Sequence, residues 1–225
     1  MFTVGAPLWG SAAGGGEPVV ASLLHFDGTN GSTTYTNEVP GRSWSGGGPS
    51  LPTLSTGTKK FGTASVNMGN DRHVRSFAVS GLDFSGDYSV DFWMYPTGDT
   101  EFYFLLLDGS SRVKMSAGTY FGSVVSHRRF DDSMAIESND GAGSLLFRWS
   151  HVFAGRKNGI DYIAHNGAMV STSGKPNTIM GGPPAQLVLG VGTYSSAYFD
   201  ELRVVTGGCD YTTNFTPPSA PYTYT

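Results

Sequence analysis

The chain has 225 residues, of which 32 are glycine and 12 are proline, and only 14% are charged. Aromatic residues make up 13%, so the chain can bury a large core and does not have the composition of a disordered segment. The net charge of −4 gives no basic footprint for nucleic acid, and no apolar run is long enough to span a bilayer.

Residues 1–18 are predicted to form a flexible arm ahead of a single β-domain over residues 19–225. Glycine-rich chain loses much conformational entropy when it becomes ordered, and this segment has little to bury. It nevertheless carries Phe2, Leu8 and Trp9. Two interpretations stay open: these side chains anchor the domain to a partner, or they fold back onto the domain itself.

Alternating apolar and polar residues predict about a dozen short strands and no amphipathic helix of useful length. The stretch 36–58 is rich in glycine and proline and is expected to be a long irregular loop. The predicted strands cover residues 19–26, 60–68, 73–79, 88–96, 101–107, 120–125, 133–136, 145–153, 160–164, 168–171, 186–191 and 198–205.

The segment 88–96 has the clearest strand pattern in the chain. One of its faces is purely apolar and is expected to lie in the core: Tyr88, Val90, Phe92 and Met94. The other face mixes a carboxylate with two amphipathic rings: Ser89, Asp91, Trp93 and Tyr95. Such a face suits a surface that is partly wet or used for contact.

Two local signals fix details of strand pairing. Asn166-Gly167 is the strongest short hairpin signal in the sequence. Phe199 and Leu202 cannot share a face in a regular strand, which predicts a bulge near Asp200-Glu201. The proline-rich tail is expected to be extended and unable to pair centrally. Together these features predict an all-β protein, an antiparallel two-sheet sandwich or jelly roll.

Six motifs follow one another along the chain: Leu24-His25-Phe26-Asp27-Gly28, Lys60-Phe61-Gly62-Thr63-Ala64-Ser65-Val66, 88–96, Trp149-Ser150-His151-Val152, Asn166-Gly167 and Phe199-Asp200-Glu201-Leu202-Arg203-Val204. In this order and spacing they resemble the laminin-G-like branch of the concanavalin A-like lectin/glucanase fold. The ending Tyr211-Thr212-Thr213-Asn214-Phe215-Thr216-Pro217-Pro218 resembles copies of this module in tailed-phage virion proteins. The resemblance covers about residues 22 to 222 and implies a two-sheet jelly roll. It fixes no function, because the fold hosts lectins, hydrolases and adhesins.

The chain departs from the family pattern at two places. The hairpin that often ends in Val-Asp-Gly reads His165-Asn166-Gly167, so no acidic side chain stands there to act as a ligand. The strand after Trp149 turns to Gly155-Arg156-Lys157, where the family continues a polar and aliphatic alternation. The end of this strand is therefore not fixed by the sequence.

Catalysis is not expected. Glycosidases need two carboxylates flanking the scissile bond, and hydrolases of this fold set them on one strand as Glu-x-Asp-x-x-Glu, a run that the chain lacks. Cys209 lies in a Gly-Gly-Cys-Asp turn without a neighbouring base. As the single cysteine it cannot form an internal disulfide, and no signal peptide is visible, so we expect synthesis in a host cytoplasm.

A structural calcium ion is one of two interpretations of Asp27 and Asp200. By the resemblance, these positions can lie together where the first and last strands pair, and an Asp-Gly loop offers carboxylate and carbonyl oxygens to calcium. In the other interpretation, which we favour, Asp27 caps its turn and Asp200 bonds to Arg203 or to its own backbone. No other cofactor is expected.

Two binding functions remain. The first is a bacteriophage virion surface protein, a capsid decoration or fibre component attached to other virion proteins through its arm, with a homotrimer expected from the habit of that class. The second is a carbohydrate-binding adhesin on the virion that recognises a cell-surface glycan. A sugar site needs exposed rings, and the candidates, each of which can equally be a core or interchain residue, are Trp44, Trp93, Tyr95 and Tyr120.

Overall fold

The structure is a computed structural model of the chain. It describes residues 18–69, 71–76, 84, 86–98, 101–108, 111–118, 124–128, 134–138, 146–172, 186–191 and 196–225. Over 101–108, 111–118, 124–128, 134–138 and 171–172 only the backbone is described.

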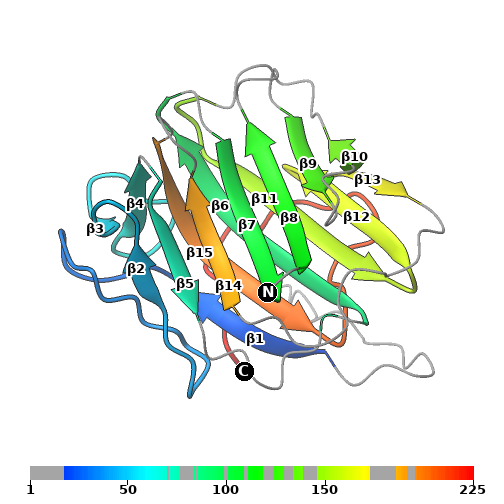
Figure 1. Ribbon diagram of the computed structural model, residues 1–225, viewed down its shortest axis with the longest axis horizontal. Helices are drawn as coiled ribbons and strands as arrows, with labels where there is room; N and C mark the ends of the chain where they lie inside the picture. Colours follow the sequence, from blue (N-terminus) through cyan, green and yellow to red (C-terminus); the bar gives the residue numbers. More distant parts are fainter. Residues whose placement is uncertain are drawn as a thin grey trace, which may run out of the picture.

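The described chain forms fifteen strands, and none of its residues is helical. Figure 1 shows them as two layers of arrows facing each other. The strands are β1 Val19–Leu24, β2 Ser45–Gly47, β3 Thr53–Ser55, β4 Ser65–Gly69, β5 His73–Ser76, β6 Tyr88–Pro96, β7 Glu101–Asp108, β8 Ser111–Gly118, β9 Val124–Arg128, β10 Met134–Ser138, β11 Ser150–Lys157, β12 Ile160–His165, β13 Ala168–Thr172, β14 Gln186–Val191 and β15 Ser196–Thr206.

Two antiparallel sheets make the sandwich. The larger has eight strands in the order β13-β12-β11-β6-β15-β4-β3, with β1 added to β15. The smaller has seven, in the order β10-β9-β8-β7-β14-β5-β2. Strand neighbours are therefore mostly not sequence neighbours, which is the crossed topology of a jelly roll. The predicted fold class is confirmed.

The inner faces of the sheets bury the core. On β6, Val90, Phe92 and Met94 are at most 1% exposed, as the alternation predicts. They pack with Phe199 and Leu202 of β15, both fully buried. These last two share the core because the register between β15 and β6 shifts between Asp200 and Arg203, with Glu201 at φ 54°. The predicted bulge is confirmed, and it also turns Asp200 and Arg203 to the outer face of the sheet.

Turn chemistry accounts for the hairpins on one side of the large sheet. Asn166 and Gly167 have φ of 49° and 81°, as the predicted two-residue turn requires. Asn158 and Gly159, at 50° and 80°, make a second such turn that the sequence analysis did not single out. Consequently β11 does not end at residue 153 but runs on to Lys157.

The departure at Gly155-Arg156-Lys157 has a packing reason. A Cβ atom at Gly155 would lie 2.5 Å from Cys209 Sγ, so only glycine lets residue 209 lie against β11. Arg156 forms a buried ion pair with Asp161 on the neighbouring strand. The glycine and the arginine are therefore structural requirements of this sheet.

Three further differences concern short strands. The stretch 36–58 is not one irregular loop, because it contains β2 and β3. The sequence analysis also predicted no strand at β8, Ser111–Gly118, which mixes two long cationic residues with small residues and has few large apolar ones. The first strand ends at Leu24 rather than at residue 26, since Phe26 has a φ of 56°. No helix among the described residues has the length and apolar character to cross a membrane.

Candidate functional site

The outer face of the large sheet carries three rows of side chains that run across the strands. Register places His151 and Asp200 on either side of Trp93, and Phe153 and Arg203 on either side of Asp91. We call His151, Trp93 and Asp200 the loop row. Phe153, Asp91 and Arg203 form the tail row. A third set, the open row, consists of Trp149, Tyr95, Tyr198 and Asn67.

The tail row is covered by the C-terminal segment 207–225, which we call the tail. Arg203 donates to Asp91 through Nε at 3.0 Å and pairs with Asp210 at 2.6 Å. The Tyr222 hydroxyl donates to Asp91, and its ring stacks 3.9 Å from the Arg203 guanidinium. Phe153 packs against Phe215, with ring centres 5.8 Å apart. Extended, unpaired chain therefore seals this part of the sheet.

Asp91 is fully buried within this network. Burial opposes its ionisation, but Arg203 and His151 offset that effect and hold the pKa of Asp91 below its usual value. His151 Nε2 lies 3.2 Å from Asp91 Oδ2, and His151 is itself fully buried. This pair holds the tail in place and has no opening to solvent through which a substrate would reach it.

The loop row is covered by residues 57–63, which two carboxylates hold in place. Asp200 Oδ2 accepts hydrogen bonds from the backbone N–H groups of Lys60 and Phe61, at 2.8 and 3.1 Å. Asp27 accepts from Thr63 and, at 3.1 Å, from the Ala64 N–H. Asp27 therefore bonds to a loop distant in sequence rather than capping its own turn, and Asp200 bonds to that loop and to the Glu201 N–H rather than to Arg203. Burial raises the pKa of Asp200 to about 7, against the opposing effect of those donors.

Metal ligands do not gather in the part of the chain that the structure describes. No three His, Cys, Asp or Glu side chains there are placed to share an ion. Asp27 is exposed at one end of the loop, whereas Asp200 is fully buried beneath the other end.

The open row lines a groove of about 520 Å³. Its floor is formed by Tyr95 and Trp149, whose ring centres are 5.5 Å apart, and Tyr198 continues the row at 6.2 Å from Tyr95. All three rings are half-buried, so each is fixed by its neighbours and still presents surface to solvent. The wall of the groove is the segment 57–62. The groove is shallow and open to solvent, and its described lining is more polar than apolar.

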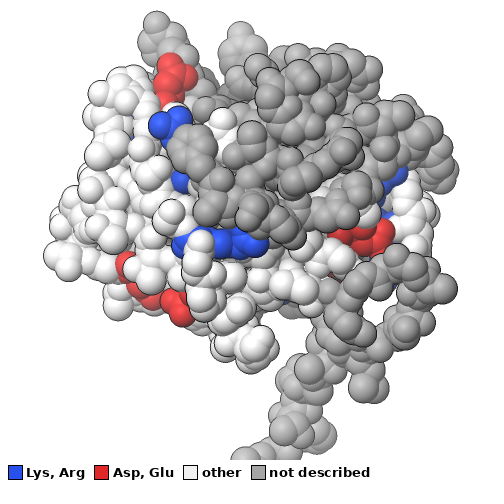
Figure 2. Space-filling view, turned by 60° about the horizontal axis from the view of Figure 1, so that its bottom comes forward, with Lys and Arg blue, Asp and Glu red and all other residues white. Residues whose placement is uncertain are grey.

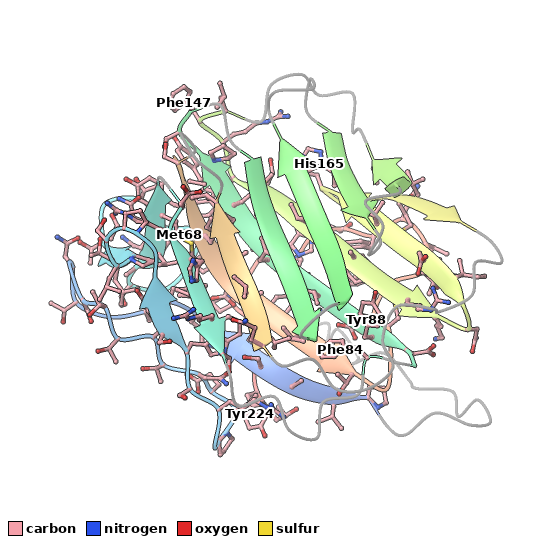
Figure 3. All side chains as sticks on the ribbon, viewed as in Figure 1. Met68, Phe84, Tyr88, Phe147, His165 and Tyr224 are labelled. Atoms are coloured by element: carbon pink, nitrogen blue, oxygen red, sulfur yellow. The ribbon has the colours of Figure 1, made fainter. Side chains whose placement is uncertain are left out.

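Phe147 stands beside the groove, two residues before Trp149. It is 64% exposed, although its N–H donates to the Pro96 carbonyl at 2.9 Å. Its φ is 58°, in the left-handed region that a bulky side chain enters only at a cost. Figure 3 shows Phe147 at one end of the molecule and Tyr224 at the opposite end. Phe147 is therefore a strained, exposed aromatic residue two positions before a residue that lines the groove.

The structure places the aromatic residues that the sequence analysis named as candidates for a sugar site in different environments. Tyr95 lines the groove, and Trp93 lies under the segment 57–62 beside it, with 6% of its surface exposed. Trp44 is instead a core residue, because its indole N–H donates to Ser22 Oγ at 2.9 Å and its ring has no face free for a sugar. Tyr120 and the arm residues Phe2, Leu8 and Trp9 lie outside the described residues.

Two groove residues, Trp149 and Lys60, and the adjoining ring of Tyr198 were not candidate site residues in the sequence analysis. Both rings were predicted to lie in strands, over residues 145–153 and 198–205, but the face that they share with Tyr95 was not predicted. Their meeting depends on the order β11-β6-β15, which alternation along each strand does not contain. No pattern in the sequence predicted that the segment 57–63, which carries Lys60, would fold over Trp93.

Comparison with known proteins shows the fold. No family model matches the chain, and no curated sequence does. The receptor binding domain of botulinum neurotoxin mosaic serotype C/D superposes with a TM-score of 0.63 at 9% identity, over 85% of this chain and 48% of that one. The binding domain of botulinum neurotoxin DC, solved in complex with SialylT, gives 0.60 at 10% identity, over 85% and 48%. The chain thus spans about half the length of these toxin domains.

A second kind of neighbour matches over nearly its whole length. It is domain 4 of AbnA, a GH43 extracellular arabinanase from Geobacillus stearothermophilus, solved in complex with arabinotriose. The TM-score is 0.63 at 18% identity, and the match covers 87% of this chain and 96% of that one. At these identities the comparisons establish a shared β-sandwich architecture.

Proposed function

We propose that this domain is a carbohydrate-binding module of the receptor-binding kind and that the groove along the open row is its glycan site. The observation that carries the proposal is the row Trp149–Tyr95–Tyr198, three adjacent rings that are held by packing and left uncovered. Rigid rings offer apolar surface to the C–H face of a sugar at little entropic cost.

The polar groups needed to orient a sugar are close to the rings. Asn67 ends the row on β4 opposite Tyr198, and Thr58 and Lys60 belong to the wall. Rings for stacking together with an amide, a hydroxyl and an ammonium make a mixed site of the kind that binds sugars. The sandwich neighbours support this use of the architecture, since arabinotriose accompanies one and SialylT another.

Binding without turnover is part of the proposal. The buried His151–Asp91 pair is the nearest thing to a base with an orienting carboxylate in the described chain, and the tail covers it. No carboxylate that could serve as acid or nucleophile is among the described residues that line the groove.

The setting on a phage virion, as a decoration or fibre component made in the host cytoplasm, is proposed from the resemblance alone. The segment 211–218 that carries the phage-type resemblance is an integral part of this domain, because Tyr211 stacks on Phe215 at 3.7 Å and both lie over β11. Attachment through Phe2, Leu8 and Trp9, and assembly as a trimer, stay predictions. Protein identification in purified particles tests the setting.

The glycan site is tested by a glycan-array screen followed by titration of the best ligand. Trp149→Ala should weaken binding at least tenfold, or about 1.4 kcal/mol, because it removes the floor of the groove. Tyr224→Ala is the matched control, an aromatic residue that is 45% exposed at the other end of the molecule and should leave affinity unchanged. Absence of binding at ~1 mM sugar, the level of a −4 kcal/mol interaction, would overturn the proposal.

A further inference from the structure

The side chain of Lys60 occupies an unusual place at the groove. Its Nζ lies 3.9 Å from the centre of the Trp93 ring and 5.4 Å from that of Phe61. Within the described chain this ammonium donates no hydrogen bond and forms no ion pair. Burial lowers the pKa of Lys60, and the nearby Asp200 opposes that effect. The ammonium is therefore partly desolvated and held over two rings, and its N–H donors face solvent rather than an acceptor of the described chain.

The neighbouring Lys59 provides a comparison within the same wall. Lys59 is exposed, and its ammonium donates to the Thr56 carbonyl at 3.0 Å, so its charge is hydrated and engaged elsewhere. Lys60 is half-buried and turned toward the sheet face. Of two adjacent lysines, only Lys60 is held where a ligand on the rings would meet it.

Among the residues that the structure describes, the lining of the groove includes Lys59 and Lys60 and neither Asp nor Glu. The closest carboxylate beneath the wall, Asp200, already accepts three backbone N–H groups, those of Lys60, Phe61 and Glu201. On the face drawn in Figure 2, the described basic and acidic side chains lie in small separate groups. The described lining of the groove differs in carrying two cations and no anion.

We infer that the ligand of the groove is an acidic saccharide, one whose sugar carboxylate pairs with Lys60 while its ring stacks on Tyr95 and Trp149. The inference rests on the proposed function and names the substrate class of the same site. A carboxylate supplies the acceptor that the Lys60 ammonium lacks, and a charge-assisted hydrogen bond of this kind is among the strong ones. Two sources offer this chemistry, a hexuronate within a chain and a terminal sialate.

The test compares ligands that differ only in charge. Trigalacturonate, sialyllactose and the methyl ester of each are titrated by calorimetry into the whole chain at ~50 mM and ~500 mM salt, because added salt screens an exposed ion pair. We expect one of the two acids to bind at least about tenfold more tightly than its neutral counterpart at low salt, with the difference shrinking at high salt. The acid that shows this preference identifies the source.

Three variants assign the effect to one residue. Lys60→Met should erase the preference for the acid while leaving the weak binding of the neutral sugar, because the methionine chain still covers Trp93. Lys60→Arg should keep the preference, and Lys59→Met should reduce it by less than about threefold, because the Lys59 ammonium already donates to the Thr56 carbonyl. Melting temperatures of all three, measured without ligand, verify that the domain stays folded.

Each remaining outcome has a distinct meaning. Equal binding of acid and neutral partner by the wild-type protein overturns the inference and leaves the glycan site standing. Loss of the preference in Lys59→Met but not in Lys60→Met overturns the assignment to Lys60. Failure of all four sugars, together with an empty glycan array, overturns the proposed function as well.

Discussion

The tail row and the open row lie on one face of one sheet, four residues apart along β6 at Asp91 and Tyr95. Both are built from the mixture of rings and polar groups that the sequence shows. In the tail row every group meets a partner from the tail, and Asp91 is fully buried. In the open row three rings stay half-exposed. The two rows contain the same kinds of residue. They differ in that the tail covers one row, whereas the rings of the other row stay open to solvent.

Asp91 gives the strongest test of the contrast between the tail row and the open row. Asp91→Ala should lower the free energy of unfolding by about 3–5 kcal/mol, because it leaves the Arg203 guanidinium with only Asp210 and removes the acceptor of Tyr222. Urea denaturation measures the change. Glu38→Ala, at an exposed acidic residue, is the control and should cost less than about 0.5 kcal/mol. If Asp91→Ala lowered the free energy of unfolding by as little as Glu38→Ala, the contacts of the tail row would not stabilise the fold.

Phe147 tests whether an exposed aromatic residue near the open row carries backbone strain that lowers the stability of the domain. Phe147→Gly should raise the free energy of unfolding by about 1 kcal/mol, since glycine adopts a φ of 58° without strain. It should weaken glycan binding less than Trp149→Ala does, because Phe147 is not among the residues that line the groove. Thermal melting and titration measure the two effects.

The control for Phe147 is Asn158→Gly, at a φ of 50°. Asparagine tolerates this conformation in a hairpin turn, so the substitution should change stability by only a few tenths of a kcal/mol. A variant of Phe147 that is no more stable than the wild type would show that the residue is not strained.

The smallest expected effect concerns pH at the far end of the tail. The Glu201 carboxylate accepts from His25 at 2.8 Å and from the Tyr222 N–H at 3.0 Å, so it joins β1 to the tail. The hydrogen bond to Glu201 raises the pKa of His25 above 6.5, although burial opposes the rise. The stabilisation is therefore complete below about pH 6.5 and is lost as pH rises through the folded-state pKa.

Denaturation of the wild type and of His25→Gln at ~pH 5.5 and ~pH 8.5 measures this contribution. The wild type should be more stable than the variant by a few tenths of a kcal/mol at the lower pH, and the difference should vanish at the higher one. If the stability difference between wild type and variant instead grew with pH, the protonated form of His25 would not be the stabilising one.

The sequence predicted what depends on local chemistry. Alternation on β6 identified its core face, the Asn166-Gly167 pair gave the hairpin, and the spacing of Phe199 and Leu202 gave the bulge. Tyr95 was also a candidate ring before its neighbours were known.

The rest of the site is produced by contacts that no single segment encodes. Trp149 reaches Tyr95 only through the pairing of β11 with β6, and Lys60 reaches Trp93 only because Asp200 holds the loop. The outer face of β6 was expected to be partly wet, yet Ser89 and Asp91 are fully buried. An unpaired, proline-rich tail carries no periodic signal that would reveal where it lies.

The pairing of β1 with β15 has a consequence for how the chain is made. His25 and Glu201 are 176 positions apart, so β1 leaves the ribosome long before the strand that it needs. At a synthesis rate of about 5–20 residues per second, the delay is roughly 9–35 s. During that interval the nascent β1, with Leu23 and Leu24 still uncovered, is an apolar segment without its edge partner. We expect the large sheet to close late and a holding chaperone to guard this segment meanwhile.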